Sequence, residues 1–272
     1  MSWTSLGTLL LLISAIAIST FYQTVHQQSW SLWNDIEHPL LQLFFLFAFV
    51  PFVTFALHEF IHGSLFAYFG GSPRYGVGIR YCLPYAYATS PGDRFSRNAF
   101  VIIALAPLII IDLLSLILLA IFPQAAWLGW VVILNTSGAI GDLWVAGLLL
   151  RCPASITVED QPSGFAIYAP PGLPARKLPQ PQGQQAQPLL VQWLNLTFIF
   201  VLALVFVLPF LPILFDVFNV PSFNLAINET IGFIQWQAEP GEGFNLSIDL
   251  WMMAIAPITA LIIILIQRLK TR

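Results

Sequence analysis

Charged side chains are scarce in this sequence. Asp, Glu, Lys and Arg make up only 8% of the 272 residues, whereas hydrophobic residues make up 58%. The mean hydropathy is +0.81, and soluble domains usually contain about 25% charged residues. This composition excludes an ordinary soluble domain and predicts a polytopic membrane protein.

Cysteine and clustered positive charge are also scarce. The two cysteines, Cys82 and Cys152, share no metal-ligand spacing, and we expect a structural or incidental role for them. No basic cluster or aromatic-interleaved patch is present that would bind phosphates, which argues against nucleic acid as a partner. The amino terminus lacks the basic region and cleavage site of a removable signal peptide, so the first apolar run is expected to stay as an anchor.

Six apolar runs are close to or above the roughly 20 helical residues that a bilayer demands. They lie at about 6–22, 40–69, 99–122, 126–150, 189–214 and 250–267. Together they predict an all-α polytopic membrane protein with about six transmembrane helices.

The ten basic residues indicate how these helices are oriented. They lie between the second and third helices, between the fourth and fifth, and at the carboxyl end: Arg74, Arg80, Arg94, Arg97, Arg151, Arg176, Lys177, Arg268, Lys270 and Arg272. With six helices these segments share one side of the membrane, and most acidic loop residues lie on the other. The positive-inside rule then places both termini on the cytoplasmic side. Both cysteines fall on this reducing side as well, which excludes a disulfide framework.

One motif inside the second apolar run indicates metal chemistry. His58 and His62 are four residues apart in the sequence His-Glu-Phe-Ile-His, so on a helix both imidazoles lie on one face and can bind one Zn²⁺. Glu59 follows the first histidine and can reach a water molecule at the metal. Two ligands do not make a site, and a third must come from elsewhere in the chain.

Three carboxylates lie within the predicted helices: Glu59, Asp112 and Asp142. Intramembrane acids are costly and usually functional, and no Lys or Arg lies within a span to neutralise these three. A bound divalent cation would compensate their charge. Counted from the inner ends of their helices, His58, His62 and Asp142 lie within roughly 6 Å in depth, whereas Asp112 lies near the bilayer centre. We therefore predict Asp142 as the third zinc ligand, and Asp112 as a group behind the ligands or a neutral acid bonded to a neighbouring helix.

The residues before Asp142 are small or polar. Gly138 and Gly141 allow a second helix to approach closely. Asn135 lies two turns before Asp142 and could hydrogen-bond a substrate carbonyl or a metal ligand, or could simply join two helices. Gly63, next to the second histidine, would relieve crowding beside the metal.

Residues 75–88, between the second and third helices, have the period of a strand, because large residues alternate with small or polar ones. Gly70 and Gly71 end the preceding helix, and Pro84 restricts the segment to an edge strand or divides it into the two arms of a hairpin. An edge strand beside a hydrolytic site could pair with an extended substrate, with Tyr81 as a candidate contact. The alternative is an ordinary connecting hairpin.

The distribution of Pro and Gln predicts three parts. Residues 1–150 form a four-helix membrane unit that carries the metal site. Residues 151–188 contain eight prolines and six glutamines, which predicts a flexible cytoplasmic linker. Residues 189–272 form a two-helix unit, whose outer loop at 216–249 is expected to be a lid on the bilayer surface or only a tether.

These motifs resemble those of a bacterial family of zincin membrane peptidases of unknown function. The resemblance covers about residues 45–165 and rests on His58-Glu-x-x-His62-Gly63, Tyr81-Cys82, Ala106-Pro107, Gly141-Asp142, Asp160 and Gly164. The chain is more distantly similar to site-2 proteases, in which a His-Glu-x-x-His helix and a later aspartate hold zinc within the membrane. The resemblance implies a bacterial cytoplasmic-type membrane, His58, His62 and Asp142 as ligands, and Glu59 as the catalytic acid/base. Site-2 proteases tend to have Asp-Gly where this chain has Asp142 followed by Leu143, which weakens the match at the third ligand.

We therefore predict an intramembrane zinc metalloprotease that cleaves a membrane protein in the cytoplasmic half of the bilayer. Two other classes stay open: a non-catalytic zinc-binding membrane scaffold, and a metal or proton transporter that uses Glu59, Asp112 and Asp142 as a relay. The outer halves of the second and fourth helices are almost purely apolar, which counts against a transporter.

Overall fold

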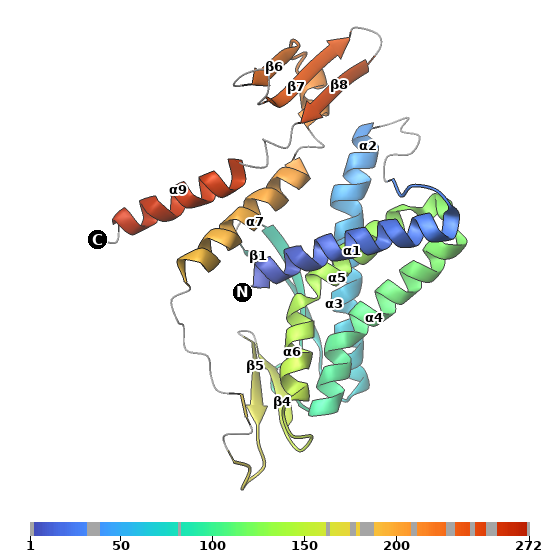
Figure 1. The fold of residues 1–272 in the computed structure, drawn as a ribbon. Coiled ribbons are helices and arrows are strands. Elements are labelled where there is room, and N and C mark those ends of the chain that lie inside the picture. The colour runs from blue at the N-terminus through green and yellow to red at the C-terminus, as the bar shows by residue number, and fades with distance from the viewer. Residues whose placement is uncertain are drawn as a thin grey trace. The chain divides into compact units, whose positions relative to one another are not determined.

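The computed structural model describes residues 3–31, 39–80, 83–161, 164–174, 178–179, 188–207, 211–226, 232–239, 243–248 and 255–270 (Figure 1). Its helices are α1 (Trp3–His26), α2 (Pro39–Phe44), the π-helix η1 (Phe45–Phe49), α3 (Val50–Tyr68), α4 (Arg97–Ile121), the 3₁₀-helix η2 (Pro123–Ala125), α5 (Trp127–Gly138), α6 (Ile140–Leu150), α7 (Leu189–Val207), α8 (Leu211–Val217) and α9 (Ile255–Lys270). Its strands are β1 (Arg74–Arg80), β2 (Leu83–Thr89), β3 (Arg94–Ser96), β4 (Thr157–Gln161), β5 (Gly164–Tyr168), β6 (Phe223–Ala226), β7 (Gly232–Glu239) and β8 (Gly243–Ile248).

Three helical segments of the described residues are long and apolar enough to cross a membrane: Leu9–His26, Leu41–Tyr68 and Arg97–Ile121. A fourth crossing is possible if α5 and α6, which meet at a bend of 48°, act as one broken span. The last two predicted spans coincide with shorter apolar helices, at Leu189–Val201 and Ile255–Ile266. The structure is thus consistent with a membrane protein, and the count of six crossings stays a prediction.

The prediction of an all-α chain with one short hairpin or edge strand was incomplete, because the described residues contain three small antiparallel sheets. β1 pairs with β2, β4 lies between β3 and β5, and β7 lies between β6 and β8. The segment that we predicted as a flexible linker supplies β4 and β5. Within it Ile156 and Val158 alternate with polar residues and are 1% and 0% exposed. The prolines and glutamines lie mostly after residue 169, and their abundance over the whole segment obscured this strand period.

The contacts divide the chain into two compact units. One comprises residues 1–8, 35–47 and 185–272, and the other comprises residues 9–34 and 48–184. In the first unit, α7 contacts α9, and the Trp193 indole donates a hydrogen bond to the Pro257 carbonyl. The predicted outer loop at 216–249 contains the end of α8 and the sheet β6–β7–β8, with Trp236 only 1% exposed.

The helix that carries the two histidines has clear ends in the sequence. Pro51 cannot donate a backbone hydrogen bond and therefore lies at the start of α3, directly after the five-residue π-helix η1. At the other end Gly70 has a φ of +86°, and the Gly70 and Gly71 amides donate to the carbonyls of Ala67 and Phe66. This is a Schellman-type termination, and it confirms the predicted helix end.

The predicted strand segment forms the β1–β2 hairpin, which packs on α3. Tyr87 and Tyr85 lie opposite Gly76 and Gly78, and each ring covers the space where a glycine Cβ would stand. The Tyr75 phenol similarly covers Gly63 of α3, where a Cβ would overlap the ring. Gly63 therefore makes room for the hairpin beside the second histidine.

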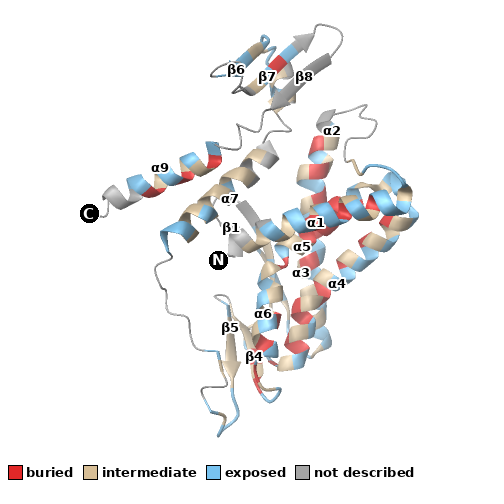
Figure 2. Ribbon diagram, viewed as in Figure 1, coloured by how far each residue is buried: buried red, intermediate tan, exposed pale blue. Residues whose placement is uncertain are grey.

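The second unit has an apolar cluster where α3, α4 and α6 meet the sheet β3–β4–β5. Buried residues recur along α3, α4 and α5 (red in Figure 2). The cluster consists of Phe66, Phe95, Ala99, Phe100, Ile103, Leu149, Cys152, Ile156 and Val158. Burial raises the pKa of the Cys152 thiol, which agrees with the structural role expected for this cysteine. Cys82 lies outside the described residues.

Candidate metal centre

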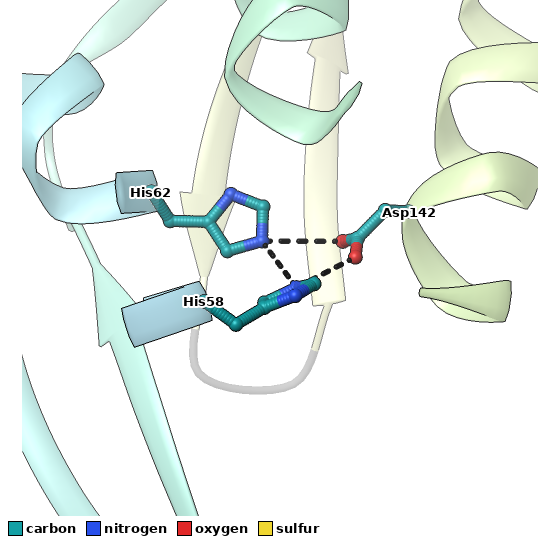
Figure 3. Close-up of side chains that lie close together, drawn as sticks. All are labelled: His58, His62 and Asp142. Carbon is teal, nitrogen blue, oxygen red and sulfur yellow. Dashed lines mark hydrogen bonds and ion pairs between the residues drawn. The ribbon is translucent and has the colours of Figure 1, made fainter. Parts of the chain in front are cut away.

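The two histidines and Asp142 converge in the second unit (Figure 3). His58 Nε2 lies 3.1 Å from Asp142 Oδ2 and 3.1 Å from His62 Nε2, and His62 Nε2 lies 3.5 Å from Asp142 Oδ1. Three tetrahedral ligand atoms at bonds of about 2.0–2.1 Å from one Zn²⁺ are about 3.3 Å apart. The observed separations fit a single zinc ion, and this is the one such group found among the described residues.

The hydrogen bonds of His58 identify its free nitrogen. Asn135 donates from Nδ2 to the Pro107 carbonyl and to Asp112 Oδ1, at 3.3 and 2.8 Å. Because a carbonyl can only accept, the amide orientation is determined, and Asn135 Oδ1 must accept from His58 Nδ1–H at 2.8 Å. His58 Nε2 therefore keeps its lone pair.

The same reasoning holds for His62. Its Nδ1 lies 2.9 Å from the Ile103 carbonyl oxygen, which can only accept, so Nδ1 carries the proton and Nε2 keeps the lone pair. Two imidazole lone pairs and a carboxylate thus face one another without a hydrogen between them. This donor set is what a divalent metal requires, and the bonds at Nδ1 are those that usually orient metal-binding histidines.

The break between α5 and α6 places Asn135 and Asp142 on opposite sides of one imidazole. We predicted a single helix at 126–150; instead α5 ends at Gly138 and α6 begins at Ile140. Asn135 lies in the last turn of α5 and Asp142 in the first turn of α6. Gly138 and Gly141 were predicted to let a second helix approach closely. A Cβ atom at Gly138 would lie 3.1 Å from the Phe55 ring of α3, whereas a Cβ atom at Gly141 would have no neighbouring atom within 4 Å.

Asp112 supports the group from behind. Its Oδ1 accepts from Asn135 and its Oδ2 accepts from the Thr136 hydroxyl at 2.7 Å. Its hydrogen bonds go to Asn135 and Thr136 rather than to a histidine. This agrees with one of the two predicted roles, that of a group behind the ligands. Asn135 hydrogen-bonds His58, a predicted metal ligand. This was one of the roles predicted for Asn135.

Glu59 is held by the hairpin. The Ala88 amide of β2 donates to Glu59 Oε2 at 2.8 Å, and this leaves Oε1 available. The sequence interpretation missed both this amide and the Ile103 carbonyl, because it considered side chains rather than backbone groups. Tyr81, the candidate substrate contact, lies outside the described residues.

Asp160 of β4 is a further acidic group near the centre. Burial raises the pKa of its carboxyl, while hydrogen bonds from the Thr89 side chain and the Ser90 backbone, and more weakly the His62 imidazole, act in the opposite direction. The sequence linked Asp160 to the site only through the family resemblance, because β4 follows the membrane helices at a long distance along the chain. The sheet β3–β4–β5 thus brings the Asp160 carboxyl near the His62 ring.

Two histidines, an acid between them in sequence and a distant aspartate form an arrangement that is typical of zinc hydrolases. Residues 51–157 match the family DUF3267, described as "Putative zincin peptidase". The matched segment includes His58, Glu59, Asp112, Asn135 and Asp142. The match confirms the family resemblance found in the sequence. No curated protein and no solved structure matches the chain. The zincin description supports a metallopeptidase and implies zinc, which the three converging side chains could hold.

Proposed function

We propose that the protein is an intramembrane zinc metallopeptidase, similar in type to site-2 proteases, that cleaves membrane proteins. The observation that carries this proposal is the convergence of two lone-pair-bearing histidines and Asp142 beside Glu59. His62 lies six residues before Tyr68, the end of its apolar helix, at a depth of about 9 Å. This depth and the predicted orientation support a cut in the cytoplasmic half of the bilayer.

The residues of the chain divide the chemistry between them. His58, His62 and Asp142 would hold zinc, which polarises a carbonyl and lowers the pKa of water when bound. Glu59 accepts the proton of the attacking water and returns it to the leaving amide nitrogen, as a general base and then a general acid. The Ala88 amide holds one carboxylate oxygen still, so that the other is directed to this proton transfer.

Metal analysis of the purified wild-type protein tests the proposal first. We expect about one zinc per chain. A chelator should remove this zinc and abolish the cleavage of membrane-protein substrates, and added zinc should restore both the bound metal and the cleavage. A wild-type protein that holds no zinc after purification and binds none when supplied would contradict the site. Zinc bound without any cleavage would contradict the peptidase.

The outer edge of β2 is the surface that we propose for the substrate. In an antiparallel pair, alternate residues direct both backbone groups away from the partner strand. The Ala88 amide bonds to Glu59 rather than to β1, and Pro84, which has no N–H, has the same parity. Ala86 therefore directs its N–H and C=O to the free edge, where an extended, locally unwound substrate segment can pair with it.

Proline substitutions can separate the two proposed roles of this edge, which are to pair with the substrate at Ala86 and to hold Glu59 at Ala88. Because residues 86 and 88 point away from β1, proline at either position removes an edge N–H without breaking the hairpin ladder. We expect Ala86→Pro to lower kcat/KM about tenfold through one lost substrate hydrogen bond, and Ala88→Pro to lower kcat by releasing Glu59. Both variants should keep their zinc. Wild-type kinetics in both variants would exclude substrate pairing at this edge.

A further inference from the structure

Helix α4 contacts both histidines of the metal centre, directly or through one residue, although it supplies no ligand. Its Ile103 carbonyl accepts from His62, and its Pro107 carbonyl and Asp112 carboxylate hold the Asn135 amide that accepts from His58. Both hydrogen bonds end at Nδ1, so α4 determines which nitrogen of each ring is left for the metal.

Pro107 explains why the Ile103 carbonyl is available. In an α-helix the amide of residue 107 would donate to the carbonyl of residue 103, but proline has no N–H. The Ile103 carbonyl is therefore released from the helix ladder, in a residue that is 1% exposed. A buried carbonyl needs a donor, and His62 Nδ1–H provides it at 2.9 Å.

Asp112 performs the equivalent task for His58. A free asparagine amide can turn over and present its NH₂ group to the histidine, which would force the proton onto His58 Nε2 and block the metal. Asn135 is 0% exposed, and Asp112 Oδ1 and the Pro107 carbonyl both accept from its Nδ2. The Thr136 hydroxyl holds the other Asp112 oxygen. The amide is therefore locked with its oxygen toward His58.

We propose that Pro107 and Asp112 are positioning residues that set the tautomers of both metal-binding histidines from a helix without ligands. The proposal rests on the zinc site of the proposed function. It gives a defined task to Asp112, an acid within a membrane helix that is not among the three converging side chains. It also predicts that two substitutions which relieve unfavourable features of a membrane helix should nevertheless weaken metal binding.

The variants Pro107→Ala and Asp112→Leu test this proposal. Alanine restores the amide that competes for the Ile103 carbonyl, and leucine removes the acceptor that holds Asn135. We expect each variant to lose about 10- to 100-fold in zinc affinity, the usual effect of removing a partner of a metal-binding histidine. The conservative variant Asp112→Asn can still accept from Asn135 and should lie closer to wild type. Zinc affinity is measured by competition with a chromophoric chelator, and the Co²⁺-loaded absorption spectrum reports the ligand geometry.

Thermal unfolding of the metal-free proteins separates positioning from general damage. A helix interior is more stable without proline, so the unfolding temperature of Pro107→Ala should hold or rise while its zinc affinity falls. Leu113→Ala, at a neighbouring position that is 57% exposed, is the matched control and should leave affinity unchanged. Unchanged affinity in both test variants would overturn the proposal, as would losses that follow a falling unfolding temperature. A metal-free wild type would instead overturn the zinc site itself.

Discussion

Replacing Glu59 with glutamine should abolish peptide cleavage while leaving zinc in place. Glutamine has the same shape and can still accept the Ala88 amide hydrogen bond through its Oε1 atom, so the local geometry should survive. It cannot take a proton from water, and general acid–base catalysis contributes about 10²- to 10⁴-fold to rate. We expect kcat to fall by about that factor with one zinc per chain retained.

The measurement is a comparison of membrane proteomes from cells that make either wild type or Glu59→Gln as the only copy. Full-length substrates should accumulate with the variant, and the purified wild type should cleave them. Glu159→Gln is the matched control, because Glu159 bonds Tyr168 and Arg94 in the sheet β3–β4–β5 and is not one of the three converging side chains. Zinc-loaded Glu59→Gln that turns over these substrates at the wild-type rate would indicate a zinc-binding scaffold.

Removing a metal-binding side chain should have the opposite signature, with zinc itself lost. His58→Ala and Asp142→Ala each remove one of the three converging ligands. We expect zinc affinity to fall by more than the roughly 10- to 100-fold that follows loss of an outer partner, and cleavage to be lost in parallel. Zinc per chain, measured by elemental analysis after dialysis at a fixed free zinc concentration, checks this.

Asp93→Ala provides the control for these ligand variants. Asp93 accepts from the Ser72 amide and the Ser90 hydroxyl, and these bonds lower the pKa of its carboxyl, but it takes no part in the metal-binding group. Its removal should leave zinc content unchanged. Undiminished zinc in Asp142→Ala would disprove Asp142 as the third ligand and redirect attention to Asp160.

The convergence of His58, His62 and Asp142 could be anticipated from the sequence because each residue left a separate trace. The spacing of His58 and His62 identifies a helical face, and an intramembrane acid without a cationic partner demands an explanation. Depth counting then favoured Asp142 over Asp112, and the structure brings Asp142 to the histidines. The hairpin was predictable because tyrosines alternate with small residues and Pro84 interrupts the run.

Other features left weaker traces. The strands β4 and β5 are short and lie in a segment dominated by proline and glutamine, so composition concealed their alternating pattern. The break between α5 and α6 has no proline, and small residues such as Ala139 are compatible with either a straight or a bent helix. The Ile103 carbonyl could have been anticipated, because any proline inside a helix releases the carbonyl four residues earlier. What could not be anticipated is which side chain would use it.

Pro107 leaves the Ile103 carbonyl without its helix donor, and His62 supplies the missing hydrogen bond. His62 therefore also stabilises the packing of α3 against α4. Within a bilayer no water is available to satisfy a released carbonyl, and each unsatisfied backbone group costs several kcal/mol. Loss of His62 would strand the Ile103 oxygen as well as remove a ligand, whereas loss of His58 strands only a side-chain amide oxygen. The two histidines therefore differ in their structural roles. The hydrogen bond from His62 to the Ile103 carbonyl joins α3 to α4 whether or not a metal is bound.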